Sequence, residues 1–302
     1  MKKFLLTICI TVTVLFAVIA GKNLFSCDIP IHNRGIRALL DAGDLNVLFL
    51  GSSTFRSNLD ITQIDEAFGG KTFILAYGGN QYVAENIQYD EIRNRGNHTY
   101  DLLVIELNPM LLTEEVKLSD SRVIWDLSWD GKRRLWKSMA DGGNVTFPMF
   151  FEYFVTAGMD DLLTYPVTEP FYATRYYKGA KTDETASGGR DFLEGEMFDI
   201  SRIEPVSAQV DALFSLIEKC ERDGQDYVVL ESPHYYRLQE DPAYVRIRDE
   251  VCAQLAKKQA PMILASDVDF DDHEAAYFED MSHMSAEGRR AYAKLLLPLL
   301  QR

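Results

Sequence analysis

Five short apolar runs alternate with longer amphipathic stretches along this 302-residue chain, and this alternation limits the fold more than any other feature. Short runs rich in Val, Ile and Leu are typical of strands buried on both faces of a parallel sheet. The expected strands are Asn46–Leu50, Thr72–Leu75, Leu102–Leu107, Tyr227–Leu230 and Met262–Leu264. The expected helices are Ile61–Phe68, Tyr82–Arg95, Ser207–Arg222, Tyr244–Lys258 and Ser285–Leu300. Strands and helices in regular order predict an α/β fold with a five-stranded parallel sheet, which binds ligands at the carboxyl ends of its strands.

The N-terminus carries an uncharged run, Phe4–Ala20, directly after Lys2 and Lys3. As a helix this run would rise about 25 Å, just short of the ~30 Å hydrocarbon core of a bilayer. The lysines favour a cytoplasmic N-terminus, with the rest of the chain outside the membrane. A cleaved signal peptide ending at Ala20 is the alternative, and it also exports the domain. We expect residues 1–22 to form a membrane anchor, 23–45 a linker with a lead-in helix, and 46–302 one domain.

Composition excludes several functions. The formal net charge of −15 and the pI of about 4.8, with scattered basic residues, would repel a phosphate backbone, so no nucleic-acid partner is expected. The four cysteines have no metal-ligand spacing, although an exported location would permit a Cys220–Cys252 bridge. The chain lacks the Walker A, HExxH and GxGxxG motifs. No metal or other cofactor is therefore expected.

Residues 109–205 interrupt the alternation of strands and helices. They contain all three tryptophans of the chain, an aromatic stretch at Phe147–Phe154 and a polar segment at Lys181–Phe192. An insertion of this length between two sheet strands usually forms a lid or a wall over the ligand site. Its aromatic residues are expected to form the insertion's own small core, with a sugar-binding platform as the alternative.

The first strand ends in the sequence GSS at Gly51–Ser53. A glycine at a strand end allows a sharp turn, and a small residue after it presents its side chain and N–H at the mouth of the site. Ser53 is thus a candidate nucleophile, although a serine at this position can simply cap a helix. Two strand-end acids, Glu106 and Glu231, could reach the site, but acids at such positions more often cap a helix or meet an arginine, which is what we expect here.

A serine nucleophile needs a base, and His283 in FEDMSHMSAEGRR is the leading candidate. Asp280 lies three residues earlier, where its carboxylate could fix the imidazole tautomer and leave the other ring nitrogen to a nearby serine. The alternative is that Ser285 caps the last helix and that His283 is incidental. His234, which follows the fourth strand, is a second candidate base.

GSS after the first strand, Gly78–Gly79 after the second and DMSH before the last helix resemble the blocks of the SGNH (GDSL-like) hydrolase superfamily. The resemblance implies a three-layer flavodoxin-like fold in which Ser53 is the nucleophile and Asp280 and His283 complete the triad. It also implies that the backbone N–H groups of Ser53 and Gly79 form the oxyanion hole.

Two positions depart from the family pattern. Ser52 replaces the usual acidic residue before the nucleophile, and the GxND of the third block is missing. The missing asparagine would supply a third oxyanion donor, and Asn108 lies close to its position, although a direct count places Met110 there. With Arg56 following, the GSS variant looks like the membrane-anchored branch that modifies cell-envelope polymers, including proteins of D-alanine transfer to teichoic acids and of exopolysaccharide O-acetylation. Candidate residues of the substrate pocket are Ser52, Arg56, Asn80 and His234.

These features together predict an exported, membrane-anchored serine enzyme. It would hydrolyse or transfer an acyl ester on a cell-envelope or extracellular polysaccharide through a covalent acyl-enzyme. The expected partners are the membrane, a glycan substrate and a multi-spanning membrane protein that exports the acyl group. The alternative is a glycan-binding or assembly subunit on a degenerate hydrolase fold.

Overall fold

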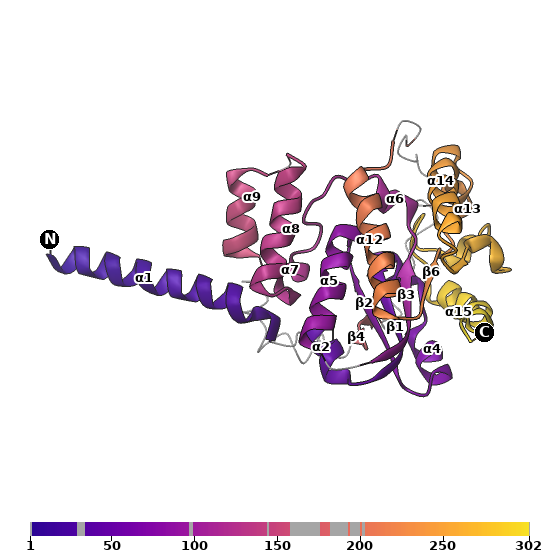
Figure 1. Cartoon of the computed structure of the whole chain (residues 1–302), viewed down its shortest axis with the longest axis horizontal. Coiled ribbons are helices and arrows are strands. Elements are labelled where there is room, and N and C mark those ends of the chain that lie inside the picture. Colours follow the sequence, from indigo (N-terminus) through magenta and orange to yellow (C-terminus); the bar gives the residue numbers. More distant parts are fainter. Residues whose placement is uncertain are drawn as a thin grey trace.

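The centre of the structure is a five-stranded parallel sheet in the order β2-β1-β3-β6-β7 (Figure 1). The structure is a computed structural model and describes residues 2–28, 34–96, 99–143, 145–157, 176–181, 193, 200 and 203–301. The strands are β1 (Leu45–Ser52), β2 (Thr72–Tyr77), β3 (Tyr100–Glu106), β6 (Tyr227–Leu230) and β7 (Met262–Ile263). All five predicted strands are present and every pairing is parallel, so the predicted α/β fold is confirmed.

The sheet divides the core into two layers because successive side chains of a strand point to opposite faces. On one face Leu48 and Leu50 pack with residues of α2 (Gly35–Ala42), α5 (Tyr82–Arg95), α12 (Ser207–Asp223) and α14 (Pro242–Lys257). On the other face Val47 and Phe49 pack with residues of α3 (Ser53–Asn58), α4 (Ile61–Ala67) and α15 (Ala286–Leu300). The result is the predicted three-layer arrangement, and the chain changes direction between β1 and β3.

The predicted helices are also present, with shifts of a few residues at some ends. The short helix α3, which begins on Ser53, was not predicted. The segments that follow β6 and β7 carry α13 (Tyr236–Gln239), η3 (Ala265–Asp267) and η4 (Ala275–Tyr277). All four cysteines are free, so the structure does not contain the Cys220–Cys252 bridge that the sequence allowed.

The N-terminal helix α1 (Lys2–Phe25) projects from the domain and continues into η1 (Ser26–Asp28), as Figure 1 shows. It is long and apolar enough to cross a membrane, and the apolar window that meets this test is unburied; a signal sequence has the same properties. The helix is buried against the domain at its end: Lys22 and Asn23 are buried there, and so is Ser26 of η1. The helix is therefore exposed along its apolar length and fixed at its base.

The insertion after β3 consists of two described parts. The first contains α6 (Pro109–Leu112), α7 (Ser121–Asp126), α8 (Trp129–Asp141), α9 (Phe147–Phe151) and the π-turn η2 (Glu152–Thr156). Its helix α8 packs against α5, and η2 contacts α1. Trp136 makes ring contacts with Phe150, Tyr153 and Phe154, so these aromatics do form a small cluster of their own.

The second part of the insertion is the hairpin of β4 (Tyr176–Tyr177) and β5 (Ala180–Lys181). It lies along the free edge of β2, where the Ile74 N–H donates to the Lys178 carbonyl at 2.9 Å. The Lys178 ammonium bonds both carboxylate oxygens of the buried Asp65, at 2.7 and 2.8 Å. The polar segment predicted at Lys181–Phe192 begins with the last residue of β5, and its remaining residues, 182–192, lie outside the described residues.

Candidate active site

Ser53 lies at the junction between β1 and α3, at the carboxyl edge of the sheet. Ser52 caps α3, because its Oγ accepts a hydrogen bond from the Thr54 N–H at 3.2 Å. The Ser52 hydroxyl is buried and committed to that network, whereas Ser53 is partly exposed. Ser53 therefore presents the available hydroxyl, and Ser52, predicted as a residue of the pocket, supports the turn from beneath.

Ser53, His283 and Asp280 form a continuous hydrogen-bonded chain. The Ser53 Oγ lies 3.0 Å from His283 Nε2, and His283 Nδ1 lies 2.8 Å from Asp280 Oδ2. Nucleophile, imidazole and carboxylate follow in the order of a serine hydrolase triad. The His283 and Asp280 side chains keep 28% and 46% of their surface exposed, so the site is open to solvent.

A tight turn holds the Asp280 carboxylate in place. Its Oδ1 accepts from the backbone N–H groups of Ser282 and His283, at 2.8 and 2.9 Å. Burial raises the pKa of Asp280, but the hydrogen bonds and charge of His283 and the two backbone donors outweigh it, so that the pKa lies below its usual value. An ionised Asp280 holds the proton on His283 Nδ1 and leaves Nε2 as an acceptor facing Ser53.

Asn58 ties the nucleophile helix directly to the loop that carries His283, and the sequence alone gave no sign of it. Its Nδ2 donates to the Ser282 carbonyl at 3.0 Å, and its Oδ1 accepts from the Met284 N–H at 2.8 Å. The amide thus bonds the backbone on both sides of His283 and is fully buried. Its position five residues after Ser53 in α3 gives the two catalytic candidates a common support.

Glu106 lies beneath the Ser52–Ser53 turn at the end of β3. It accepts from the Ser52 N–H and, at 3.0 Å, from the Ser52 hydroxyl. Burial raises its pKa even though hydrogen bonds from Ser52, Asn108 and Thr54 act in the opposite direction. The prediction that Glu106 caps a helix or meets an arginine was wrong, because its partners are the backbone and side chains around the nucleophile.

Gly51 is required by this close approach of Glu106. A Cβ at position 51 would lie 2.8 Å from the Glu106 Cβ and would collide with its Oε2. Gly51 belongs to the regular strand β1 and has no positive φ. The prediction that this glycine allows a sharp turn is therefore corrected: the glycine makes room for a carboxyl group.

Asn108 belongs to the same network and does not face Ser53. Its Nδ2 donates to Thr54 Oγ1 at 3.2 Å and to Glu106 Oε1 at 3.3 Å, while its Oδ1 caps α6 through the Met110 N–H. Both amide protons are thus used. This corrects the expectation that Asn108 serves as an oxyanion donor.

Two backbone donors remain for an oxyanion. The first N–H groups of a helix have no partner within it, which applies to Ser53 at the start of α3. Gly79 has φ +59°, in the left-handed region that favours glycine. Among the described residues, neither the Ser53 nor the Gly79 N–H has an acceptor. Asn80 links the Gly79 turn to the end of β1, since its Nδ2 donates to the Gly51 carbonyl at 3.2 Å.

The other pocket candidates have supporting positions. Asn80 is buried and also donates to Gln88 at 2.9 Å. Arg56 is half-buried on α3, one turn beyond Ser53. His234 is buried edge-on against Tyr244. Burial, reinforced by the nearby His283, lowers the pKa of His234 to about 4, so its imidazole remains neutral. His283 and not His234 lies against the Ser53 Oγ, so His234 does not take the place of the base that the sequence suggested as a second candidate.

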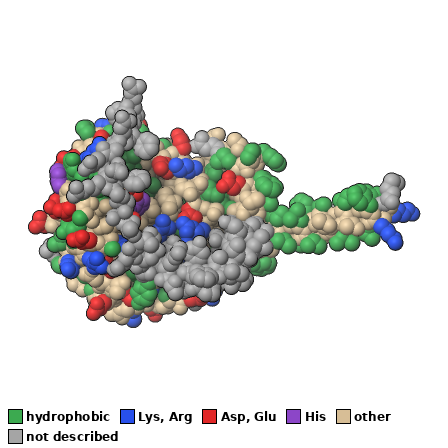
Figure 2. Space-filling view, turned by 180° about the vertical axis from the view of Figure 1, so that it is seen from behind, with side chains coloured by type: hydrophobic (Ala, Val, Ile, Leu, Met, Phe, Trp, Pro, Cys, Tyr) green, Lys and Arg blue, Asp and Glu red, His purple; other side chains and the backbone are tan. Residues whose placement is uncertain are grey.

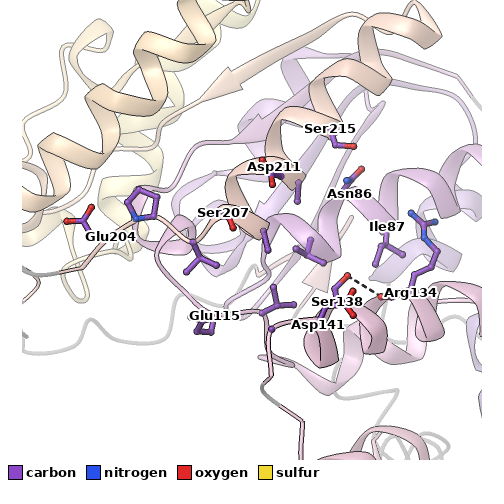
Figure 3. A pocket seen from close by; sticks show the side chains of 17 residues that line it. Asn86, Ile87, Glu115, Arg134, Ser138, Asp141, Glu204, Ser207, Asp211 and Ser215 are labelled. Atoms are coloured by element: carbon purple, nitrogen blue, oxygen red, sulfur yellow. Dashed lines mark hydrogen bonds between the residues drawn. The ribbon is translucent and has the colours of Figure 1, made fainter.

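A cleft of about 830 Å³ lies elsewhere, between α5, α8 and α12 (Figure 3). Arg134, Asp141 and Asp211 are among the side chains that line it, and no triad residue does. The cleft is therefore separate from the site of Ser53, His283 and Asp280, and the insertion helix α8 forms one of its walls.

Comparisons with known proteins do not assign a function to the chain, so the functional assignment rests on the geometry of the site. No protein-family model and no curated protein matches the chain. A proposed acylhydrolase of Bacteroides fragilis is 11% identical, with 84% of this chain and 86% of that chain covered, at a TM-score of 0.41. A GDSL-like lipase of Bacteroides thetaiotaomicron is 11% identical, with 84% of this chain and 87% of that one covered, at a TM-score of 0.37. Likenesses this distant carry no argument about function.

Proposed function

We propose that the protein is a membrane-anchored serine hydrolase or O-acyltransferase of the SGNH (GDSL-like) type, with Ser53, His283 and Asp280 as its catalytic triad. The observation that carries the proposal is the hydrogen-bonded chain from the Ser53 Oγ through His283 to Asp280. The sheet order β2-β1-β3-β6-β7 supports it, because it places Ser53 at the point where the chain reverses direction, where open α/β sheets bind ligands.

The reaction begins when the Ser53 Oγ attacks an ester carbonyl and His283 Nε2 takes its proton. Asp280 stabilises the imidazolium that forms, and the N–H groups of Ser53 and Gly79 donate to the oxyanion. The C–O bond of the ester then breaks, His283 returns the proton to the leaving alcohol, and the acyl group stays on Ser53. Water or a sugar hydroxyl, deprotonated by His283, attacks the acyl-enzyme and frees Ser53.

A cell-envelope or extracellular polysaccharide is the proposed substrate. The partly exposed His283 and Asp280 suit a polymer, since a chain that extends beyond the site must reach Ser53 from the surface. The apolar helix α1 would hold the domain on the outer side of the membrane, close to such polymers and to a multi-spanning protein that exports acyl groups.

One observation favours a second function, that of a glycan-binding or assembly subunit without turnover. Both amide protons of Asn108 are bound within the protein, which leaves two oxyanion donors where the family pattern implies three. Loss of one such donor typically costs about 10²–10³ in rate, so a slow enzyme is the expected outcome rather than an inactive one.

Turnover by the full chain in vesicles tests the proposal. Wild type should hydrolyse a chromogenic acetyl ester, and Ser53→Ala and His283→Ala should not. Ser57→Ala is the matched control, because it removes a hydroxyl from the same helix α3 outside the triad. Acylation of an added oligosaccharide by the acyl-enzyme would identify a transferase. Absence of both reactions in folded wild type would favour the assembly subunit.

A further inference from the structure

An exposed apolar surface lies where the insertion meets the N-terminal helix. A groove of about 720 Å³ runs between α1 and the α8–α9–η2 region, and its lining is apolar except for Asn23. Leu15, Phe16 and Ile19 line it from α1, and Phe150, Phe151 and Phe154 from the insertion. Figure 2 shows hydrophobic side chains on the domain at the base of the helix, continuous with those along it.

The aromatic side chains around this groove are unusually exposed. Phe147, Phe151 and Phe150 have 79%, 50% and 44% of their surface accessible, and Trp129 has 42%. Large contiguous apolar patches are rare on soluble surfaces and mark sites that contact a membrane or a protein. The buried cluster around Trp136 explains the inner aromatics of the insertion, but it does not explain these outer ones.

If α1 spans a bilayer, as proposed above, the groove lies near the outer edge of its hydrocarbon core. The α1 residues that line it begin at Leu15, and the apolar run ends at Ala20, about 8 Å further along the helix. Interfacial helices bury their apolar faces about 5–10 Å into the boundary between headgroups and acyl chains, where Trp and other aromatic residues are common. The outer aromatics of the insertion would therefore enter the hydrocarbon edge whenever α1 spans the bilayer.

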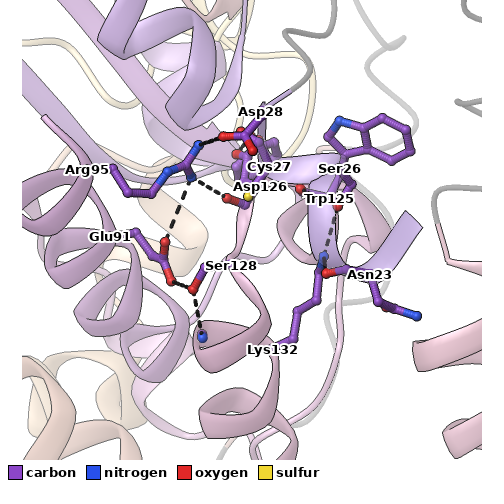
Figure 4. A network of polar contacts seen from close by, with 12 residues as sticks. Asn23, Ser26, Cys27, Asp28, Glu91, Arg95, Trp125, Asp126, Ser128 and Lys132 are labelled. Carbon is purple, nitrogen blue, oxygen red and sulfur yellow. Dashed lines mark hydrogen bonds and ion pairs between the residues drawn. The ribbon is translucent and has the colours of Figure 1, made fainter. Parts of the chain in front are cut away.

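A buried polar junction keeps the helix and the insertion in this relation (Figure 4). The Lys132 ammonium of α8 donates to the Asn23 carbonyl and to the Ser26 Oγ, both at 2.8 Å. The Lys22 ammonium donates to the Ala157 carbonyl at 2.8 Å, and the Asn23 Nδ2 to the Phe154 carbonyl at 2.7 Å. Buried charged and amide groups cannot lose these partners without a large penalty, so α1 cannot swing freely.

We infer that Trp129, Phe150 and Phe151, with the adjoining face of α1, form a lipid-embedded surface in the outer leaflet, with acyl chains filling the groove. Membrane helices pack against one another through small residues, but the α1 side of this groove consists mostly of large ones. Lipid chains fit such a wall better than a partner helix does. The inference rests on the proposed membrane anchoring and is independent of the acyl chemistry.

Tryptophan quenching in vesicles tests the inference. The full-length Phe151→Trp variant is reconstituted in phosphatidylcholine vesicles whose acyl chains are brominated near the headgroup or near the bilayer centre. Leu295→Trp is the matched control, because Leu295 is an exposed residue of α15, at the end of the domain opposite α1 in Figure 1. The emission of wild type, with its three native tryptophans, is subtracted from each.

The added tryptophan at 151 should be quenched several-fold more strongly by shallow bromines than the one at 295. Equal quenching at the two positions overturns the inference. Protection of position 151 from quenching also overturns it, in vesicles where crosslinking shows a second copy of the chain in the groove. Extraction of the protein by alkaline carbonate overturns the anchoring and the inference together. Loss of fluorophosphonate labelling with the quenching intact refutes only the catalytic proposal.

Discussion

Asn58 should control catalysis without touching the substrate, because its amide fixes the backbone on both sides of His283. In Asn58→Ala the Met284 N–H loses its acceptor in a buried position, which should cost about 1–3 kcal/mol of unfolding free energy. The loop is then free to shift relative to α3. A displacement of about 1 Å at a reacting group can cost about 10²-fold in rate. From this magnitude we expect kcat for ester hydrolysis to fall about 10- to 100-fold. KM should be nearly unchanged.

The rate of fluorophosphonate labelling, measured beside thermal unfolding, separates positioning from stability. The matched control is Asn46→Ala, since the Asn46 Nδ2 makes the same kind of bond, to the Phe68 carbonyl at 2.9 Å, away from the triad. Asn46→Ala should lower stability and leave labelling unchanged. Labelling of folded Asn58→Ala at the wild-type rate would show that His283 is positioned by other contacts, and the reasoning would fail.

Three further predictions concern the supports of the site and of the helix. Gly51→Ala should force Glu106 away from the turn, lower stability by about 1–3 kcal/mol and slow labelling; unchanged labelling in a folded variant would contradict this. The neutral, buried His234 has a pKa of about 4 against an ordinary 6.5, so the unfolded chain binds more protons between these values. Stability should therefore fall by about 3 kcal/mol as the pH drops from 6.5 to 4, and His234→Phe should lose this part of the slope in denaturant titrations. Ser26→Ala removes a hydrogen-bond partner of the buried Lys132 and should lower the unfolding free energy of the full chain by about 1–3 kcal/mol. The melting temperature should fall accordingly, and an unchanged melting temperature would mean that the junction does not stabilise the protein.

The strands and the triad candidates could be predicted because each has a local signal. A strand buried on both faces is a continuous apolar run, and Ser53 and His283 stand beside such elements in short polar motifs. The sheet then brings together residues 230 positions apart. The chemical roles of these residues stay predictions until turnover is measured.

The supports of the site could not be predicted because each depends on a partner remote in sequence. Gly51 has the local signature of a turn, and only the position of Glu106 shows that it makes room for a carboxyl group. Asn58 looks like an ordinary polar residue of a short helix. Lys132 gives no sign, within an amphipathic helix, that its ammonium is buried against the base of α1. Such roles follow from the tertiary structure, which periodicity does not encode.

The most direct test of the central claim is the site of covalent labelling by a serine-directed fluorophosphonate. Wild-type chain in vesicles is labelled, digested and analysed by peptide mass spectrometry. The structure predicts modification at Ser53 alone, lost in Ser53→Ala and strongly slowed in His283→Ala, with Ser52 unmodified because it is buried. Labelling at another serine, or none in folded wild type, would contradict the account.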